Sequence, residues 1–188
     1  MLETSEQVLS CEQLAEHCQD GDQHAYAELL ARYGPRVYGF LVKLVGNTHD
    51  AEDLTQDVFV KAYRNIGRFD TQRAFAPWLF TIARRTAATF HRRKRPTAPL
   101  EFEPASEAAD PLKQAESDDD CQRIWALARL LKERYFQVLW LRYRENFSVA
   151  QIAEAMEISH LNTKVLLHRA RSDLARKLRA AGMMQNLP

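Results

Sequence analysis

Apolar side chains recur every three or four positions along most of the 188 residues, which is the spacing of helices that bury one face. Residues 49–66 show this pattern most clearly. Their predicted core stripe is Ala51, Leu54, Val58, Ala62 and Ile66, and the outer face carries Asp53, Gln56, Asp57 and Val60. Runs that alternate as a strand would are scarce, and only six glycines are present. The sequence therefore predicts an all-α protein.

Two helices are expected before this one. Residues 10–18 fit a short first helix, and Asp22 is well placed to cap the second. Gly34 and Pro35 are expected to interrupt the second helix, with Pro35 as the first residue of a new helical turn. The apolar pattern then continues to Gly46.

The pattern over residues 75–93 predicts a helix with an apolar core stripe and a second stripe of aromatic and basic residues. The core stripe is Phe75, Leu79, Ile82, Thr86 and Phe90, and the second stripe is Phe80, Arg84, Ala87 and His91. Cations engage phosphates and aromatic rings stack on unpaired bases, so the second stripe suits nucleic acid. Phe80 is the aromatic residue expected to be exposed for such a role. Pro77 fits only if the regular helix begins near it.

A short helix signal, a tight turn and a long basic helix follow one another over residues 147–179. This pattern is typical of a helix-turn-helix, which places its second helix in a DNA major groove. Ser148 and Gln151 match a capping box, and Ser159 can cap the second helix. The core side of the second helix is Thr163, Leu167, Ala170, Leu174 and Leu178. The opposite side carries Leu161, Val165, His168, Arg169, Ser172 and Arg176, with Lys164 and Arg171 flanking it. A solvated basic helix is the alternative interpretation.

The formal net charge is only +1, but the charges are segregated along the chain. Residues 84–95 carry six cations and no acid, whereas residues 101–120 carry eight acids and one lysine. Residues 96–117 also hold four prolines, which is the composition of a flexible acidic linker. We therefore expect two small helical domains, 10–95 and 118–182, joined by this linker. Separate charged surfaces favour separate partners.

Several classes of protein are disfavoured. The three cysteines, Cys11, Cys18 and Cys121, indicate reduced thiols in a cytoplasm, and no metal site or cofactor is expected. There is no apolar run long enough to span a membrane and no export signal, so no membrane insertion is expected. Phosphate loops, nucleophile elbows and metalloprotease motifs are missing, so an enzyme is not expected.

Three stretches together resemble the extracytoplasmic-function sigma factors, the two-domain branch of the sigma-70 family. DAEDLTQDVFVKAYRNIGRFD (50–70) and FAPWLFTIARRTAATFHRRKR (75–95) are similar to family region 2. LKERYFQVLWLRYRENFSVAQIAEAMEISHLNTKVLLHRAR (131–171) is similar to region 4. The resemblance implies a cytoplasmic protein that binds bacterial core RNA polymerase and directs it to promoter DNA. It also implies control by an anti-sigma factor, often membrane-bound, on which the two domains would close before reopening on polymerase.

The resemblance implies three sets of site residues. The residues implied to bind polymerase are Asp53, Gln56, Asp57 and Val60. The loop 67–73 and the following helix are implied to recognise and melt the −10 element. The residues assigned to this role are Arg73, Phe80, Arg84, Arg85 and His91. The residues implied to recognise the −35 element are Leu161, Lys164, Val165, His168, Arg169, Ser172 and Arg176.

The sequence departs from the family pattern at a few positions. Arg85 replaces a usual Asn, and Glu157 stands in the turn where Gly is frequent. Leu161 and Val165 replace smaller residues, so the reading face is more apolar than the family pattern implies. The main rival hypothesis is a helix-turn-helix regulator that binds duplex operator DNA without polymerase. A weaker rival is an adaptor that makes only protein contacts.

Overall fold

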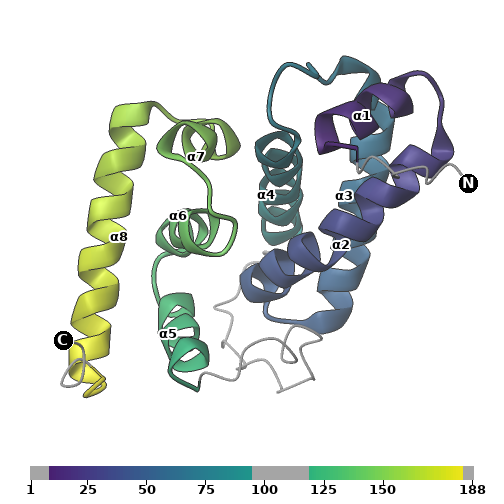
Figure 1. Cartoon of the computed structure of the whole chain (residues 1–188). Coiled ribbons are helices and arrows are strands. Elements are labelled where there is room, and N and C mark those ends of the chain that lie inside the picture. The colour runs from purple at the N-terminus through teal and green to yellow at the C-terminus, as the bar shows by residue number, and fades with distance from the viewer. Residues whose placement is uncertain (1–8, 95–118, 184–188) are drawn as a thin grey trace, which may run out of the picture.

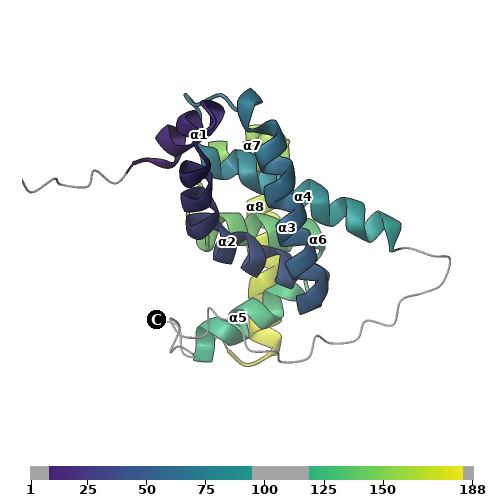
Figure 2. The same cartoon turned by 90° about the vertical axis from the view of Figure 1, so that its right-hand side faces the viewer.

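The computed structural model describes residues 9–94 and 119–183 (Figure 1). Within these ranges the chain is helical and contains no strand, which confirms the all-α prediction. The predicted linker, 96–117, lies outside the described residues. Two groups of helices are present, α1–α4 and α5–α8, and Figure 2 shows α8 passing behind the first group.

The first group contains α1 (Cys11–Gln19), α2 (Gln23–Val45), α3 (Thr48–Asn65), the short 3₁₀ helix η1 (Ile66–Arg68) and α4 (Phe75–Arg93). Side chains that accept backbone N–H groups fix the starts of the first three helices: Ser10 before α1, Asp22 before α2 and Asn47 before α3. All five residues of the predicted α3 core stripe are buried. Pro77 is the third residue of α4, where the missing N–H does not break the helix.

The prediction that Gly34 and Pro35 interrupt the second helix is wrong, because α2 runs through both residues. Pro35 is exposed, and so is Ala31, whose carbonyl loses its intrahelical donor and can bond to water. The opposite side of α2 buries Tyr33 and Val37 across the same turn. Packing of that face holds the helix together where local preference would end it.

The second group contains α5 (Asp119–Arg129), α6 (Glu133–Tyr143), α7 (Val149–Met156) and α8 (His160–Ala180). The capping box predicted for Ser148 and Gln151 is present at the start of α7. Ser159 caps α8 by accepting the N–H of Asn162 at 3.2 Å. The helix-turn-helix is thus α7, a tight turn and α8.

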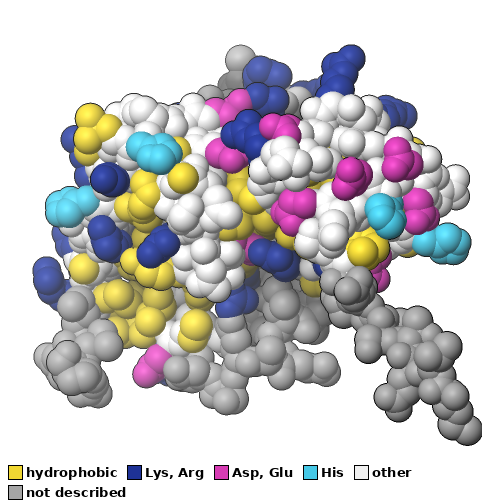
Figure 3. All heavy atoms as spheres, turned by 45° about the horizontal axis from the view of Figure 1, so that its top comes forward, with side chains coloured by type: hydrophobic (Ala, Val, Ile, Leu, Met, Phe, Trp, Pro, Cys, Tyr) yellow, Lys and Arg dark blue, Asp and Glu magenta, His cyan; other side chains and the backbone are white. Residues whose placement is uncertain are grey.

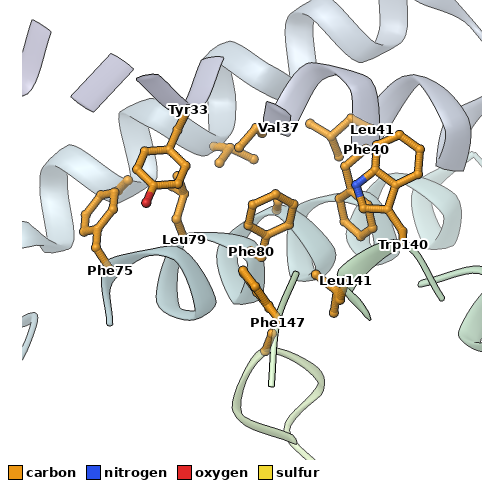
Figure 4. Close-up of a cluster of buried hydrophobic side chains, with 14 of the residues drawn as sticks. Tyr33, Val37, Phe40, Leu41, Phe75, Leu79, Phe80, Trp140, Leu141 and Phe147 are labelled. Atoms are coloured by element: carbon orange, nitrogen blue, oxygen red, sulfur yellow. The ribbon is translucent and has the colours of Figure 1, made fainter. Parts of the chain in front are cut away.

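The two groups share one buried core, which Figure 4 shows in close-up. Phe80 of α4 meets Phe40 of α2 and Phe147, which precedes α7, with ring centroids 5.4 and 5.6 Å apart. Trp140 of α6 packs on Phe40 from the other side, at 6.2 Å. The expectation that Phe80 is exposed is therefore wrong: it is 1% exposed. Phe80 and Ala87 of this stripe are buried because α7 and the segment before it pack against α4.

Candidate polymerase and nucleic-acid interfaces

The outer face of α3 is open to solvent. Asp53, Gln56, Asp57 and Val60 are all exposed, so the structure brings the four predicted polymerase-contact residues together on one face. The Lys61 Nζ lies 3.8 Å from Asp57 Oδ2, a loose and exposed pair that leaves the carboxylates available. Tyr63, which sequence reasoning missed, is 48% exposed three residues beyond Val60. The face therefore combines acidic residues at its N-terminal end with an apolar and aromatic end.

A groove of about 380 Å³ runs between α3, η1 and α4. Its lining includes the cations of Lys61, Arg68 and Arg85, and no acidic residue. The indole of Trp78 lies at the apolar side, half-buried against Phe69, with ring centroids 5.0 Å apart. Cations beside a partly exposed aromatic ring suit a nucleotide, whose phosphate and base require both. Sequence reasoning missed Lys61 for this role. It assigned the loop 67–73 and the following helix to the −10 element but did not single out Arg68 or Trp78 within them.

The outer face of α8 is also open. All seven residues predicted to read DNA are exposed, including Leu161 at 71% and Val165 at 42%. The opposite side buries Thr163, Leu167 and Ala170, which fixes the rotation of the helix about its axis. In Figure 3, basic, histidine and hydrophobic side chains mingle on the left-hand side of the molecule, the side of α8. A mixed basic and apolar helix face fits a major groove, where phosphates and thymine methyl groups are both within reach.

The turn between α7 and α8 is made by Glu157, which has φ +55° and ψ +45° in the left-handed region. Its N–H donates to Glu154 O at 3.0 Å, and the N–H of Ile158 donates to Ala153 O at 3.0 Å. This pair of bonds is the usual helix stop that favours Gly at the left-handed position. Glu157 therefore keeps the turn geometry that is usual for Gly, with a strained backbone.

The side of α4 that was predicted to meet the −10 element faces this turn. Arg84 Nε donates to Ala155 O at 3.1 Å, a carbonyl at the negative C-terminal end of α7. Arg73, from the turn before α4, pairs with Glu154 of α7 at 2.8 Å. Thr81 also lies 3.5 Å from Ala155 O. A cleft of about 840 Å³ beside these contacts is lined by residues from both helix groups.

Glu157 is held by two guanidinium groups at once. Arg84 donates to its Oε2, and Arg85 donates to both carboxylate oxygens, with Nε 3.0 Å from Oε2. The hydrogen bonds from Arg85 lower the pKa of the Glu157 carboxyl below its usual range, and the positive charges of both arginines act in the same direction. The carboxylate is therefore ionised at neutral pH and bridges α4 to the helix-turn-helix.

A second ion pair joins the groups deeper in the interface. Arg36 of α2 donates from Nε and Nη2 to Glu145 Oε2 at 2.8 and 2.6 Å, and Trp140 Nε1 donates to Glu145 Oε1 at 3.2 Å. The Glu145 side chain is 3% exposed and that of Arg36 is 39% exposed. Burial raises the pKa of Glu145, and the charge of Arg36 opposes this. Each carboxylate oxygen has a donor, as a buried charge requires.

The structure thus places four of the five predicted −10 residues in contact with the second group: Arg73, Phe80, Arg84 and Arg85. His91, near the end of α4, is half-buried, and its ring packs on Phe90 instead. Among residues 9–94 and 119–183 there is no cluster of three or more potential metal-ligating side chains. Nor does any helix in those ranges have the length and apolar character needed to cross a bilayer.

Comparison with known proteins identifies the family. The model of Sigma-70 region 2 matches residues 29–97, and that of Sigma-70 region 4 matches residues 121–174. The chain is 31% identical over 171 residues to the ECF RNA polymerase sigma factor SigW of Bacillus subtilis, covering 85% of this chain and 91% of SigW. The chain belongs to the extracytoplasmic-function sigma factors. The sigma-H factor of Pseudomonas aeruginosa is 30% identical over 179 residues, 89% of this chain and 93% of that factor.

Two solved structures share the fold. CnrH, solved in complex with the cytosolic domain of CnrY, superposes with a TM-score of 0.69 at 23% identity, covering 90% of this sigma factor and 97% of CnrH. RpoE of Bartonella quintana, solved with the anti-sigma factor NepR, gives a TM-score of 0.65 at 23% identity, covering 82% and 96%. In this sigma factor the region 2 match extends from α2 through α4, and the region 4 match covers most of α5–α8.

Proposed function

We propose that this sigma factor binds core RNA polymerase through the outer face of α3 and directs it to promoters that α4 and α8 recognise. The observation that carries the proposal is the presence, in one chain, of an exposed acidic and apolar face on α3 and an exposed basic face on α8. The family models for region 2 and region 4 match these two parts of the chain. A self-sufficient regulator would not need the α3 face.

The −10 element is assigned to the groove between α3 and α4 and to the arginines beside it. Melted promoter DNA offers unpaired bases and a flexible backbone. Trp78 supplies a partly exposed ring, and Lys61 and Arg68 supply charge for phosphates, within one groove. Arg85 lines the same groove, so its guanidinium can serve DNA only after it leaves Glu157.

The −35 element is assigned to the N-terminal half of α8 as duplex DNA. Lys164 and Arg169 lie on the exposed side together with Leu161 and Val165. Arginine pairs with guanine or with a phosphate, and apolar side chains contact thymine methyl groups. The role of the chain is therefore binding rather than catalysis, in the cytoplasm where polymerase and promoters are found.

Control by an anti-sigma factor is part of the proposal. CnrH and RpoE, which share the fold, were solved with the cytosolic domain of CnrY and with NepR. An inhibitor with a cytosolic domain, anchored in a membrane, fits the same arrangement here.

Transcription in vitro with purified core polymerase and a pool of genomic fragments tests the proposal. We expect promoter-directed transcripts with the unmodified chain. Asp53→Lys with Asp57→Lys should abolish core binding, whereas Arg169→Gln with Arg176→Gln should retain core binding and lose promoter selection. Glu16→Lys with Asp20→Lys, two exposed sites on and directly after α1, adds the same positive charge and is the control. Tight binding of duplex operator without polymerase, with no transcript from any fragment, would establish the rival regulator instead.

A further inference from the structure

Three arginines that line one side of α4 and its preceding turn all end on the first helix of the helix-turn-helix or its turn. Arg73 meets Glu154, and Arg84 and Arg85 share Glu157. Arg84 is the most enclosed, with its side chain 18% exposed, whereas that of Arg85 is 63% exposed. We name Arg73, Arg84 and Arg85 with Glu154 and Glu157 the arginine–glutamate clasp.

The backbone at Glu157 points to a role for its side chain. A residue with a Cβ is strained in the left-handed region, where glycine is not. Glycine would make the same turn without that strain. The side chain that is retained there places one carboxylate within reach of two guanidinium groups from the other helix group. Backbone strain is thus accompanied by a contact that glycine could not make, a pattern found where the contact serves function.

The chemistry of the clasp is that of a phosphate site occupied by carboxylates. A guanidinium fork binds a carboxylate and a phosphate with the same two parallel N–H donors. The groove between α3 and α4 continues the basic surface through Lys61 and Arg68, and Arg85 belongs to both the clasp and the groove. A strand of DNA following these cations would reach the guanidinium groups that Glu157 now holds.

We propose that Glu154 and Glu157 occupy the positions of DNA phosphates on Arg73, Arg84 and Arg85, so that the unbound chain keeps its −10 surface closed with its own helix-turn-helix. This rests on the proposed function, since it takes the α4 side as the −10 surface. Closure then needs no inhibitor protein. Phe80 and Phe147 add apolar contact to the closed state, and the clasp makes it specific.

Closure must lower the affinity of the chain for single-stranded DNA. When only the open form binds, the apparent dissociation constant is the intrinsic one divided by the open fraction. While the closed form predominates, a variant that multiplies the open fraction multiplies the affinity by the same factor. Affinity is therefore a more sensitive measure than molecular shape, because the apolar contacts keep most molecules closed.

The experiment measures binding of a short fluorescein-labelled single-stranded DNA of random sequence, by anisotropy, without polymerase. Glu157→Gln and Glu157→Gly should each bind on the order of tenfold more tightly than the unmodified chain. The glycine variant also relieves the strained turn, so lost folding cannot mask the result. Glu16→Gln makes the same change in net charge on the exposed surface of α1 and should bind as the unmodified chain does.

Two further comparisons decide the interpretation. The gain from Glu157→Gln should vanish when Arg84 and Arg85 are both changed to Gln, because the carboxylate then has nothing to occupy. An equal gain in that background, or equal affinity of Glu157→Gly and Glu16→Gln, would overturn the clasp. If the clasp fails while the unmodified chain still directs core polymerase to promoters, the sigma function stands. If no promoter is used, the proposed function fails whatever the DNA affinity.

Discussion

The buried pair of Arg36 and Glu145 gives a quantitative prediction about the joint between the two helix groups. Arg36→Met keeps most of the aliphatic stem and removes the charge, which leaves a carboxylate that is 3% exposed and retains the Trp140 N–H as a donor. Removing one partner of a buried pair costs roughly 3–5 kcal/mol. Because the Arg36 side chain is 39% exposed, solvent screens its charge, and we expect about 2–3 kcal/mol.

The assay is urea denaturation with thermal melting as a second probe. A loss of about 2–3 kcal/mol corresponds to a fall in Tm of roughly 5–10 °C for a chain of this size. Glu145→Gln removes the buried charge and keeps an acceptor for Trp140, so it should cost only about 1 kcal/mol. The double variant should then be more stable than Arg36→Met alone, a reversal that simple loss of packing cannot produce.

Acidification gives an independent test of whether the charge of Glu145 lowers the stability of the folded chain. The pKa of Glu145 is raised by burial, so its protonated form is favoured in the folded chain and its ionisation lowers stability as pH rises through that pKa. Loss of Arg36 removes the larger of the two charges, Arg36 and Arg144, that oppose this shift, so the defect of Arg36→Met should be largest at neutral pH and shrink on acidification. A variant as stable as the unmodified chain at pH 7, or a double variant no better than Arg36→Met, would refute the reasoning.

Four other outcomes are expected. Phe80→Ala should cost about 3–5 kcal/mol in urea denaturation, because its ring fills the shared core, whereas Val60→Ala on the open face of α3 should stay within about 0.5 kcal/mol. Ser148→Ala removes the cap of α7 and should cost about 1 kcal/mol by the same measurement; no change would mean that the capping box is idle. The pKa of Glu157 is lowered, so the stability difference between the unmodified chain and Glu157→Gln should be complete above roughly pH 4.3 and disappear as pH falls through the lowered pKa, seen in melts across pH. Leu161→Ala should leave Tm unchanged and alter the −35 sequences that are enriched in a selection with polymerase; identical enriched sequences would count against apolar readout.

The period of apolar residues was sufficient to predict α3 and α8 and the rotation of each helix. In both, one side is buried against neighbours from the same helix group, so a local pattern carries the information. Capping by Ser148 is equally local. The open faces of α3 and α8 followed from the same periodicity.

The predictions that were wrong, or that could not be made, depended on contacts between residues far apart in the chain. Phe80 belongs to a stripe that is half polar in the sequence. It lies in the core because Phe147, from the other helix group, packs against it. Gly34 and Pro35 carry strong local signals for a break, but packing of Tyr33 and Val37 overrides them. Arg85 and Glu157 were each noted as unusual for the family, yet nothing local relates two residues 72 positions apart. Their opposite charges were the one feature of the sequence that suggested a contact between them.

The position of Trp140 gives the molecule a built-in optical reporter. Its indole is 3% exposed, packs on Phe40 of the other helix group and donates to Glu145. Separation of the groups would hydrate this ring and shift its emission to longer wavelength, while Trp125, 5.2 Å away within the second group, keeps its neighbour. With Trp78 changed to Phe, the remaining emission would follow separation of the two helix groups in real time, without any attached dye.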